Sequence, residues 1–466
     1  MKPGNVSTVS TVTAVPRRVC VVGAGYVGLT AAGCLSHLGH QVRCVESDPR
    51  RLRQLQTGSI PIYEPGLEEL VAAGRSNGRL EFFAEVAPAI EGAEVALVCV
   101  GTPPQPSGEP DLGALAHAAR QLAAAATRDL IVVVKSTVPP GTCEALALVC
   151  DEAASPGVLI RVASSPEFLR ESRAVEDFMA PDRVVVGADH PDVAEMVASL
   201  YPAGSTVVHC DRRGAELVKY AANTFLAAKI SFANEVARLC EALGTDADAV
   251  LAGVGLDSRI GTAFLRPGPG YGGSCLPKDV AGFRAVGRSL GLDTLLADAA
   301  EAENFHARQA IVDKLQLVMG SLDGKRVGVL GLAFKAGTDD TRDSPGLHIA
   351  QQLAEAGADV RCFDPLASSD QAPGTWTDDV AGAVTDADAV VFTTAADEFA
   401  ALDPAGLAAA MRGYVVVDAA GIFDLAACAD AGLTAYGVGR GAPTDFHAIV
   451  WPPLRWAHPV DALVTP

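Results

Sequence analysis

Residues 17–46 read RRVCVVGAGYVGLTAAGCLSHLGHQVRCVE, and this stretch decides the fold of the first part of the chain. A run of β-branched residues ends in the glycines Gly23, Gly25 and Gly28, and a helical stretch follows as far as Gly39. At a strand–turn–helix junction, the first glycine permits the tight turn and the second lets the backbone approach a pyrophosphate. The third allows close packing of helix on strand, and the helix N-terminus holds the phosphate charge. The pattern predicts a dinucleotide-binding turn, although a lone GxGxxG can also be a purely structural one.

Glu46 strengthens the dinucleotide interpretation. It ends the next strand, 46 − 28 = 18 residues after Gly28, where a carboxylate would accept hydrogen bonds from a ribose diol. An acidic residue there favours NAD over NADP, because its charge would repel a 2′-phosphate. Arg51 could reach the ribose or the phosphate, but Arg50, Arg51 and Arg53 together are equally typical of a solvated helix face.

Predicted strands and helices alternate on both sides of a helical middle region. The apolar runs VALVCVG (95–101) and DLIVVVKST (129–137) are continuous, which indicates strands covered on both faces and hence a parallel sheet with crossover helices. After Gly214 no Gly or Pro occurs until Gly244, which predicts one long helix or a pair in register. Strands return at KRVGVLGLAF (325–334).

The predicted fold class is therefore α/β, with two Rossmann-like, doubly wound parallel-sheet domains joined by a central long-helix region. The predicted segments are a disordered extension over 1–15, an NAD-binding domain over 16–210, a helical dimerisation domain over 211–320, a second Rossmann-like domain over 321–440 and a tail over 441–466. The long helix is a natural dimer surface, so we expect a homodimer.

Composition narrows the class of protein. The 466 residues carry 36 Lys plus Arg and 56 Asp plus Glu, a net charge of 36 − 56 = −20, which argues against a nucleic-acid or anionic-membrane partner. No apolar run approaches the roughly 20 residues that cross a bilayer, and the N-terminal stretch lacks the apolar core of a signal peptide. The eleven cysteines are scattered without a CxxC, as in proteins with reduced thiols. We expect a cytoplasmic protein without a metal site.

The segment PGYGGSCLPKD, residues 269–279, is the second chemical signal. Its glycines form a loop whose backbone can approach a ligand closely, and Cys275 follows at an expected helix start with Lys278 and Asp279 beside it. A helix N-terminus and a nearby ammonium group both lower a thiol pKa, so we interpret Cys275 as a nucleophile. The ordinary alternative for a cysteine is a small buried hydrophobe, and we assign it to the other ten.

Two further patterns allow alternatives. Glu167, within SSPEFLRE (164–171), could orient a water molecule, but the spacing Ser165-x-Glu is also a helix-start capping pattern. Lys219 and Asn223 are four residues apart and project from one helix face. They could form an anion hole, or they could belong to a solvated face.

Eight motifs occur in one order along the chain: VCVVGAGYVGLTAAGCLSHLGH, PIYEPGLEEL, VGTPP, KSTVPPGT, SPEFLRES, AELVKYAANTFLAAKISFANE, GPGYGGSCLPKD and LAFKAGTDDTRDSP. Together they resemble the UDP-glucose/GDP-mannose dehydrogenase family, from about Arg17 to about Gly439. The resemblance implies NAD-dependent oxidation of a sugar C6 alcohol to a carboxylate, with two NAD and one water used per sugar. It also implies that the second Rossmann-like domain binds the nucleotide sugar.

The same resemblance assigns roles to residues. Cys275 would trap the first-formed aldehyde as a thiohemiacetal, and the thioester formed next would be hydrolysed by water. Asp279 and Lys219 match proton-transfer and oxyanion-stabilising positions, Asn223 would hold the same oxygen, and Thr137 and Glu167 would position water. Implied cofactor contacts are Gly23, Gly25, Tyr26, Val27, Gly28, Glu46, Arg51, Thr102, Thr137, Glu171, Lys278 and Arg342. Implied substrate contacts are Phe168, Leu169, Lys219, Asn223, Phe264, Gly268, Tyr271, Gly272, Phe334 and Lys335, with Arg259 reaching into a neighbouring subunit.

The chain departs from the family pattern near its end. Where a D-x-R-N motif is usual, it reads Asp418-Ala-Ala420-Gly421, and a T-E-W pattern is replaced by Thr394-Ala-Ala396. Loss of one charge-assisted hydrogen bond to phosphate costs on the order of 1.5–3 kcal/mol. UDP-glucose, oxidised to UDP-glucuronate, is the leading substrate, and GDP-mannose is the nearest alternative. UDP-N-acetylhexosamine dehydrogenases fit less well, because their cysteine loops usually lack this serine–cysteine and lysine–aspartate setting. Cys275 and the second α/β unit argue against a two-electron hydroxyacid dehydrogenase, and the intact set of Cys275, Lys219, Asn223 and Asp279 argues against a catalytically silent nucleotide-sugar sensor.

Overall fold

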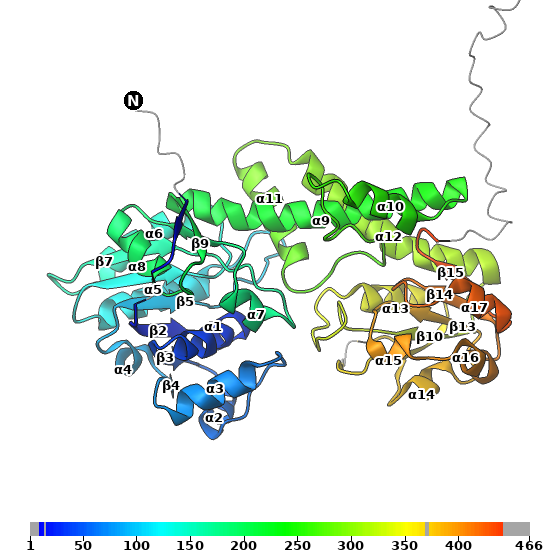
Figure 1. Cartoon of the computed structure of the whole chain (residues 1–466), viewed down its shortest axis with the longest axis horizontal. Coiled ribbons are helices and arrows are strands. Elements are labelled where there is room, and N and C mark those ends of the chain that lie inside the picture. Colours follow the sequence, from blue (N-terminus) through cyan, green and yellow to red (C-terminus); the bar gives the residue numbers. More distant parts are fainter. Residues whose placement is uncertain (1–8, 14, 369–371, 441–466) are drawn as a thin grey trace, which may run out of the picture. The chain divides into compact units, whose positions relative to one another are not determined.

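The computed structural model describes residues 9–13, 15–368 and 372–440. Residue contacts divide the chain into two compact units, each built around its own sheet (Figure 1). The first unit comprises Met1–Ala227, Ser274–Asp298 and Gly337–Asp339, and the second comprises Ala228–Gly273, Ala299–Ala336 and Asp340–Pro466. The predicted tail over 441–466 lies outside the described residues.

The sheet of the first unit has nine strands in the order β1-β9-β8-β7-β6-β5-β2-β3-β4. Counted from β2, the six strands β2 to β7 have the doubly wound order 3-2-1-4-5-6 of a Rossmann fold. The predicted parallel sheet is confirmed for these six, whereas β8 is antiparallel to β7 and β1 is antiparallel to β9. The strands are β1 (Val9–Thr11), β2 (Arg18–Val22), β3 (Gln41–Val45), β4 (Leu80–Phe83), β5 (Val95–Val98), β6 (Leu130–Val134), β7 (Ile160–Ser164), β8 (Val184–Gly187) and β9 (Thr206–Cys210).

Alternate residues of these strands point into two separate cores, one on each face of the sheet. Val21 packs on one face with α1, α3, α7 and α8, and Val22 packs on the other with α4, α5 and α6. Because both faces are covered, the strands are continuously apolar. The helices are α1 (Tyr26–His37), α2 (Pro49–Thr57), α3 (Leu67–Ser76), α4 (Val86–Ile90), α5 (Gly113–Ala125), α6 (Thr142–Ala153), α7 (Ala174–Met179) and α8 (Pro191–Ala198).

The expected disorder of residues 1–15 is wrong for the part of that segment which the structure describes. Val9–Thr11 forms β1 and pairs with Thr206–Val208 of β9. The alternating Val, Ser and Thr residues have high β-propensity, and pairing covers the backbone groups of an otherwise open sheet edge. Residues 1–8 and 14 lie outside the described residues.

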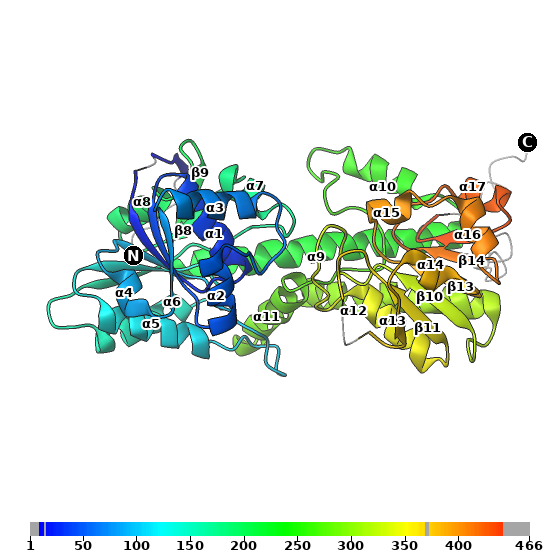
Figure 2. The same cartoon turned by 90° about the horizontal axis from the view of Figure 1, so that it is seen from below.

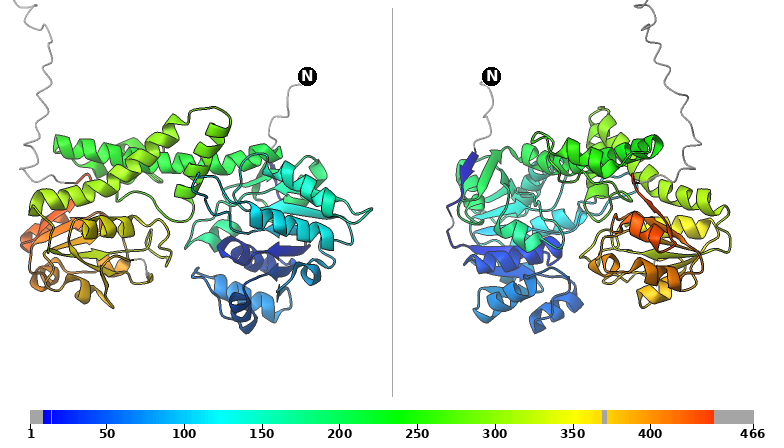
Figure 3. Two further views of the ribbon diagram at one scale, coloured as in Figure 1. Left: turned by 180° about the vertical axis from the view of Figure 1, so that it is seen from behind. Right: turned by 45° about the vertical axis from the view of Figure 1, so that its right-hand side comes forward.

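The second unit contains a fully parallel six-stranded sheet in the order β12-β11-β10-β13-β14-β15, again the 3-2-1-4-5-6 arrangement. Helices pack on both of its faces (Figure 3). The strands are β10 (Arg326–Leu330), β11 (Asp359–Phe363), β12 (Thr375–Trp376), β13 (Ala389–Phe392), β14 (Val415–Asp418) and β15 (Thr434–Gly437). The helices are α13 (Pro345–Glu355), α14 (Val380–Val384), α15 (Asp397–Ala400), α16 (Pro404–Ala410) and α17 (Leu425–Asp430).

Four helices fill the middle of the chain: α9 (Arg212–Leu243), α10 (Ala247–Gly255), α11 (Leu276–Ser289) and α12 (Leu295–Met319). The prediction of a long helix after Gly214 is confirmed, because α9 is one uninterrupted helix of 32 residues (Figure 2). Its residues up to Ala227 belong to the first unit and the rest to the second. Among the described residues, no helix is both long and apolar enough to cross a membrane.

Candidate active site

The turn between β2 and α1 has the geometry that a pyrophosphate requires. Gly23 has φ +98°, and a Cβ there would lie 2.7 Å from the carbonyl oxygen of Cys99. A Cβ on Gly28 would overlap the carbonyl oxygen of Gly23, so both positions need glycine. Gly25 is the N-cap of α1, has no side-chain cap and has open space beside its Cα. The first amides of α1 are therefore available to an anion.

Glu46 completes a cradle that fits NAD. It is buried at the end of β3, and one carboxylate oxygen accepts a hydrogen bond of 2.8 Å from the Asp48 amide. The other oxygen has no hydrogen bond to any described residue, which leaves it available to a ribose hydroxyl. Arg51 is exposed on α2, and this exposure agrees both with a contact to the cofactor and with a place on a solvated helix face.

Tyr26 ties this turn to a distant loop. Its hydroxyl donates to Glu64 and accepts a hydrogen bond of 3.0 Å from the amide of Ser172. The other Glu64 oxygen accepts a hydrogen bond from the Ala174 amide at 2.8 Å. Tyr26, predicted as a cofactor contact, therefore also anchors the loop that carries Glu167 and Glu171, while Val27 packs against the core.

The other predicted residues of the first unit gather at the carboxyl ends of its strands, where doubly wound sheets bind ligands. Thr102 follows β5, and its hydroxyl donates to the carbonyl oxygen of Thr137, which follows β6, at 2.9 Å. Glu167 follows β7. Parallel strands thus bring together three loops that are far apart in the sequence.

Cys275 is the N-cap of α11, as the sequence predicts for the nucleophile. It is half-buried, and its sulfur lies 3.6 Å from the hydroxyl oxygen of Ser274. That hydroxyl in turn donates to Glu171 at 3.2 Å. Nine of the other ten cysteines are buried and Cys210 is intermediate, in keeping with their assignment as small hydrophobes.

Two buried polar pairs lie near Cys275, and the charges of Glu167, Lys219 and Asp279 act on its thiol. The Lys219 ammonium contacts Glu167 at 2.9 Å, and the Asn223 amide donates to Asp279 at 2.5 Å. All four side chains are buried, so the alternative of a solvated face for Lys219 and Asn223 is wrong. The capping alternative for Glu167 is also wrong, because no helix begins there. Its carboxylate pairs with the Lys219 ammonium group and accepts a hydrogen bond from the Leu169 amide. Lys278 pairs with Asp279 at 2.5 Å.

The electrostatics correct one expectation about Cys275. Burial raises the pKa of the thiol, and Glu167 raises it further, while Lys219 lowers it. The sequence suggests a lowered pKa, but Lys278 pairs with Asp279 instead of serving the thiol. Although burial acts in the opposite direction, Lys219 holds the pKa of Glu167 below its ordinary value. In the same way, Glu167 and then Asp279 hold the pKa of Lys219 above its ordinary value despite burial.

Phe168 and Leu169 follow Glu167 directly. The guanidinium carbon of Arg183 lies 3.7 Å from the centroid of the Phe168 ring, and the Lys219 nitrogen lies 5.4 Å from it. Leu169 packs against the core of the first unit. The ring is therefore fixed by cations on neighbouring elements.

The glycine loop before Cys275 belongs to the second unit, and the chain passes to the first unit between Gly273 and Ser274. Asn304 on α12 accepts a hydrogen bond of 2.7 Å from the Tyr271 amide and donates to the Tyr271 carbonyl oxygen at 3.0 Å. Arg308 donates to that carbonyl oxygen at 2.7 Å. The loop conformation is therefore set by side chains of α12.

The remaining predicted residues also lie in the second unit. Phe264 has φ +61°, a strained value for a non-glycine residue. Phe334 packs beside Gly273, where a Cβ would lie 2.8 Å from its ring, and Lys335 lies 5.7 Å from the Phe334 centroid. The Gly268 amide donates to Asn234 at 2.8 Å, and a Cβ on Gly272 would overlap the Asp343 carbonyl oxygen. Arg259 pairs with Asp257 and Arg342 with Asp340, each at 2.6 Å.

The turn at Ala420 has a guanidinium group beside it although the expected arginine is absent. Arg266 is exposed and donates to the carbonyl oxygens of Ala420 at 3.4 Å and Gly421 at 2.9 Å. The fully buried Asp418 pairs with Arg440 at 2.7 Å. A cation thus reaches this strand end from a part of the chain more than 150 residues away.

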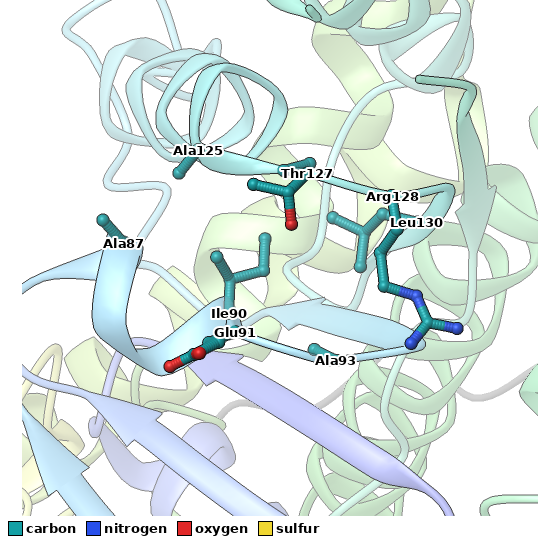
Figure 4. Close-up of a pocket in the computed structure, with 9 residues that line it drawn as sticks. Ala87, Ile90, Glu91, Ala93, Ala125, Thr127, Arg128 and Leu130 are labelled. Carbon is teal, nitrogen blue, oxygen red and sulfur yellow. The ribbon is translucent and has the colours of Figure 1, made fainter. Parts of the chain in front are cut away.

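A cavity of about 260 Å³ lies elsewhere in the first unit. Its lining includes Ile90, Glu91, Thr127 and Arg128, at the amino ends of β5 and β6 (Figure 4). Doubly wound sheets bind ligands at the opposite, carboxyl ends, so this cavity is not part of the site. In residues 9–13, 15–368 and 372–440, no group of three or more His, Cys, Asp or Glu side chains is placed to hold a metal ion.

The sequence patterns do not predict four residues that hold the loops of the site: Glu64, Lys135, Asn304 and Arg308. Asn304 and Arg308 repeat the four-residue spacing of Lys219 and Asn223, so a signal was present for that pair. Glu64 belongs to the motif PIYEPGLEEL, but only folding shows that it accepts the Tyr26 hydroxyl. Lys135 stands within KSTVPPGT, and its burial is visible only in the structure.

A dinucleotide turn, a half-buried cysteine beside a buried lysine, asparagine and two carboxylates, and a second Rossmann-like unit are the features of an NAD-dependent dehydrogenase. Three sequence models of one family match the chain: the NAD binding domain at residues 17–204, the central domain at 213–306 and the UDP binding domain at 328–425. The chain belongs to the UDP-glucose/GDP-mannose dehydrogenase family and is a nucleotide-sugar 6-dehydrogenase that uses NAD, which confirms the predicted family and cofactor.

Particular relatives agree with this assignment. The chain is 40% identical over 445 residues to the UDP-glucose 6-dehydrogenase of Pseudomonas aeruginosa, covering 91% of this chain and 97% of the relative. It is 39% identical over 435 residues to the UDP-glucose 6-dehydrogenase of Rhizobium meliloti, covering 91% and 99%. The solved structure of a UDP-glucose dehydrogenase from Pyrobaculum islandicum superposes with a TM-score of 0.85 at 40% identity, covering 91% and 98%.

Proposed function

We propose that this protein oxidises UDP-glucose at C6 to UDP-glucuronate in two NAD-dependent steps, through a covalent bond to Cys275. The observation that carries the proposal is the position of Cys275 at the start of α11, among the buried Lys219–Glu167 and Asn223–Asp279 pairs. The names of the relatives at about 40% identity support UDP-glucose as the sugar.

The cofactor would be held by the glycine turn, the α1 amides and Glu46. When bound, NAD accepts a hydride in each of the two oxidations. Lys219 and Asn223 offer an ammonium group and an amide to the oxygen on C6, where negative charge develops. Asp279, held by Asn223 and Lys278, is placed to take up or return a proton.

Covalent capture starts from a protonated thiol. Because burial raises the pKa of Cys275, the resting group is S–H. Its sulfur bonds to the aldehyde carbon while the proton passes to the aldehyde oxygen, which gives a thiohemiacetal and prevents release of the aldehyde. After the second oxidation, water adds to the thioester carbon, the C–S bond breaks and the thiol is regained. The Glu167 carboxylate accepts a hydrogen bond from that water, and Thr137 lies at the adjacent strand end.

The test is the number of NADH molecules formed per UDP-glucose consumed by the purified protein. Two NADH are expected, together with UDP-glucuronate. Cys275→Ser is expected to form none of the acid, whereas the matched control Cys210→Ser keeps the wild-type count. A Cys275→Ser protein that still yields two NADH would contradict the covalent route. Turnover of GDP-mannose but not UDP-glucose would overturn the substrate, and the altered turn at Ala420 makes GDP-mannose the alternative to assay.

The domain roles and the homodimer are part of the proposal. We assign NAD binding to 16–210, dimerisation to 211–320 and nucleotide-sugar binding to 321–440, with support from the three family matches. On α9, Phe225, Phe232 and Leu239 recur every seven residues and are 67%, 49% and 58% exposed. An apolar stripe of this spacing suits a partner helix. Sedimentation should give a dimer at micromolar concentration, and Phe232→Glu should shift it toward monomer.

A further inference from the structure

The side chain of Lys135 lies beneath the loop that carries Glu167 and has no part in the reaction above. Lys135 follows β6 and is only 2% exposed. Its nitrogen donates to the Tyr201 hydroxyl at 2.7 Å and to the Ser165 carbonyl oxygen at 3.3 Å. Both acceptors are neutral, and a buried ammonium group loses several kcal/mol of hydration unless a negative charge compensates it.

The placement of this charge is rigid. The Tyr201 ring stacks on Phe178 with centroids 5.4 Å apart, and its hydroxyl lies 3.1 Å from the Ser165 hydroxyl. Ser165 is two residues before Glu167, so Lys135 is fixed to the same loop as the carboxylate. A neutral side chain could pack in this position equally well, so packing does not explain why the residue is charged.

The negative charge on the loop that Lys135 contacts is Glu167, two residues after Ser165. Although burial raises its pKa, Lys219, then the Leu169 amide and then Lys135 lower it, so that Glu167 is ionised. Other groups near this carboxylate, each through its charge, are Arg183 before β8 and the thiols of Cys99 after β5 and Cys275 at α11. Of the cations, Lys219 forms the direct contact, at 2.9 Å, and also faces the C6 oxygen in the proposed reaction.

We propose that Lys135 is a positioning residue for the hydrolytic step, whose buried charge, held by Tyr201 and Ser165, keeps Glu167 ionised when Lys219 is engaged with the substrate oxygen. An ionised Glu167 can accept a hydrogen bond from the attacking water, and a protonated one offers that water a competing donor. This inference rests on the proposed function, because it requires a thioester on Cys275 and water held by Glu167.

Three variants separate charge from hydrogen bonding. Lys135→Gln removes the charge but keeps a donor for Ser165 and Tyr201. Lys135→Met removes both, and since an apolar group of similar length in a buried site is often tolerated, it guards against failure of the first variant to fold. Tyr201→Phe removes a partner of the ammonium group and leaves the charge in place.

The experiment measures the pH dependence of turnover with UDP-glucose and NAD, and the fraction of Cys275 carrying the acyl group by mass spectrometry of quenched protein. In both Lys135 variants the acid limb of the profile should move to higher pH, because loss of the positive charge raises the pKa of Glu167. On the acid limb itself, turnover relative to wild type should fall by up to about tenfold for each pH unit that the limb moves, and at about pH 8.5, where Glu167 is ionised in every form, it should match wild type. Acyl-enzyme should accumulate, and Tyr201→Phe should keep the wild-type limb.

The outcomes distinguish this inference from the proposed function. A wild-type protein that forms no acyl-enzyme would overturn both. A Glu167→Gln variant that keeps the acid limb would overturn the role of Glu167 in holding water, and with it the inference about Lys135. If Glu167→Gln loses the limb while both Lys135 variants retain the wild-type profile, only the inference about Lys135 is wrong. A shift in Tyr201→Phe as large as in Lys135→Gln would also overturn it, because packing and not charge would then be responsible.

Discussion

The sheets of the two units share the 3-2-1-4-5-6 order over six strands, and their first strand–helix turns have the same glycine geometry but offer different groups to a ligand. Gly23 after β2 has φ +98° and Gly331 after β10 has φ +101°. A Cβ on Gly28 would overlap the Gly23 carbonyl oxygen, and a Cβ on Gly346 would overlap that of Gly331. The amides of Gly23 and Gly331 donate to the last residues of the neighbouring strands β3 and β11, each at 2.9 Å.

The difference lies in what remains available for a ligand. In the first unit, α1 begins three residues after Gly23 and has no side-chain cap, whereas in the second unit Ser344 caps α13 through the Gly346 and Leu347 amides. Glu46 has an oxygen without a bond to a described residue. The corresponding Asp364 accepts hydrogen bonds from four backbone amides, those of Leu332, Ala333, Leu366 and Ala367.

The same glycine positions therefore do not by themselves make a dinucleotide site. The turn of the first unit leaves helix amides and a carboxylate free to bind pyrophosphate and ribose. The turn of the second unit uses the equivalent groups to hold its own longer connection. A nucleotide sugar bound by the second unit must therefore use other groups, such as those near Phe334 and the Gly421 turn.

The largest difference between the two units is expected when the paired glycines are substituted. Gly28→Ala pushes the Gly23 carbonyl out of the turn, at a cost of about 1–3 kcal/mol, so NAD affinity should fall by up to about a hundredfold. Gly346→Ala meets the equivalent carbonyl and should lower the melting temperature while leaving NAD affinity within about twofold. Isothermal titration with NAD measures both. Equal losses of NAD affinity would show that the two turns serve the cofactor alike.

The paired carboxylates should give a smaller and opposite contrast. Asp364→Ala leaves backbone amides without acceptors, so it should destabilise the protein by about 2–3 kcal/mol in urea unfolding. Glu46→Ala should cost little stability but weaken NAD binding about tenfold and reduce discrimination against NADP. Cofactor titrations and unfolding curves on both variants test this. A stability loss in Glu46→Ala equal to that in Asp364→Ala would contradict the assigned difference.

The N-caps of α13 and α1 provide a third contrast between the two units. Ser344→Ala removes a cap and should cost about 1 kcal/mol. Gly25→Ser has the reverse effect, because φ −72° suits serine and no atom lies within 4 Å of the new Cβ. A serine there should cap α1, raise the melting temperature and compete with the pyrophosphate for the α1 amides. Increased NAD affinity in Gly25→Ser would show that the uncapped amides are not the phosphate site.

The smallest expected effect concerns a feature that the two units have in common. Glu94 before β5 and Asp388 before β13 each accept a hydrogen bond from the first strand of their sheet, at the Arg18 and Arg326 amides. Although burial opposes it, the Arg18 amide and the Arg17 side chain lower the pKa of Glu94, and the Arg412 side chain lowers that of Asp388. A lowered folded pKa contributes stability above the unfolded pKa and loses it as pH falls through the folded value.

Glu94→Gln and Asp388→Asn should therefore each lower the melting temperature slightly at neutral pH. The difference from wild type should vanish in acid, below the lowered pKa values, where the wild-type carboxylates are protonated as well. Thermal melts over a pH series measure the effect. A deficit that persists unchanged in acid would mean that the hydrogen-bonding shape of the side chain matters and its charge does not.

Much of the fold and part of the site could be predicted from residues 17–46 and the motifs that follow. Period, glycine spacing and continuous apolar strands are local properties, so they indicate the two doubly wound sheets and the long α9. The strand β8 could be predicted from its apolar run, but its antiparallel pairing with β7 could not, and neither could the edge strand β1, because pairing depends on which distant strand is left uncovered. Cys275 at a helix start could be predicted from its loop, but its raised pKa could not, because burial is a tertiary property.

Local sequence patterns predict the chemical groups of this chain: a glycine turn with Glu46 for NAD, and Cys275 with Lys219, Asn223 and Asp279 for the sugar. Which of two similar glycine turns stays open depends on the fold, since the hydrogen bonds that close the second come from Ser344 and Asp364. The fold also decides that Lys135 lies beneath Glu167. The physical reason is that burial and electrostatic neighbours arise when parallel strands bring separate loops to one edge, and no local pattern encodes those distances.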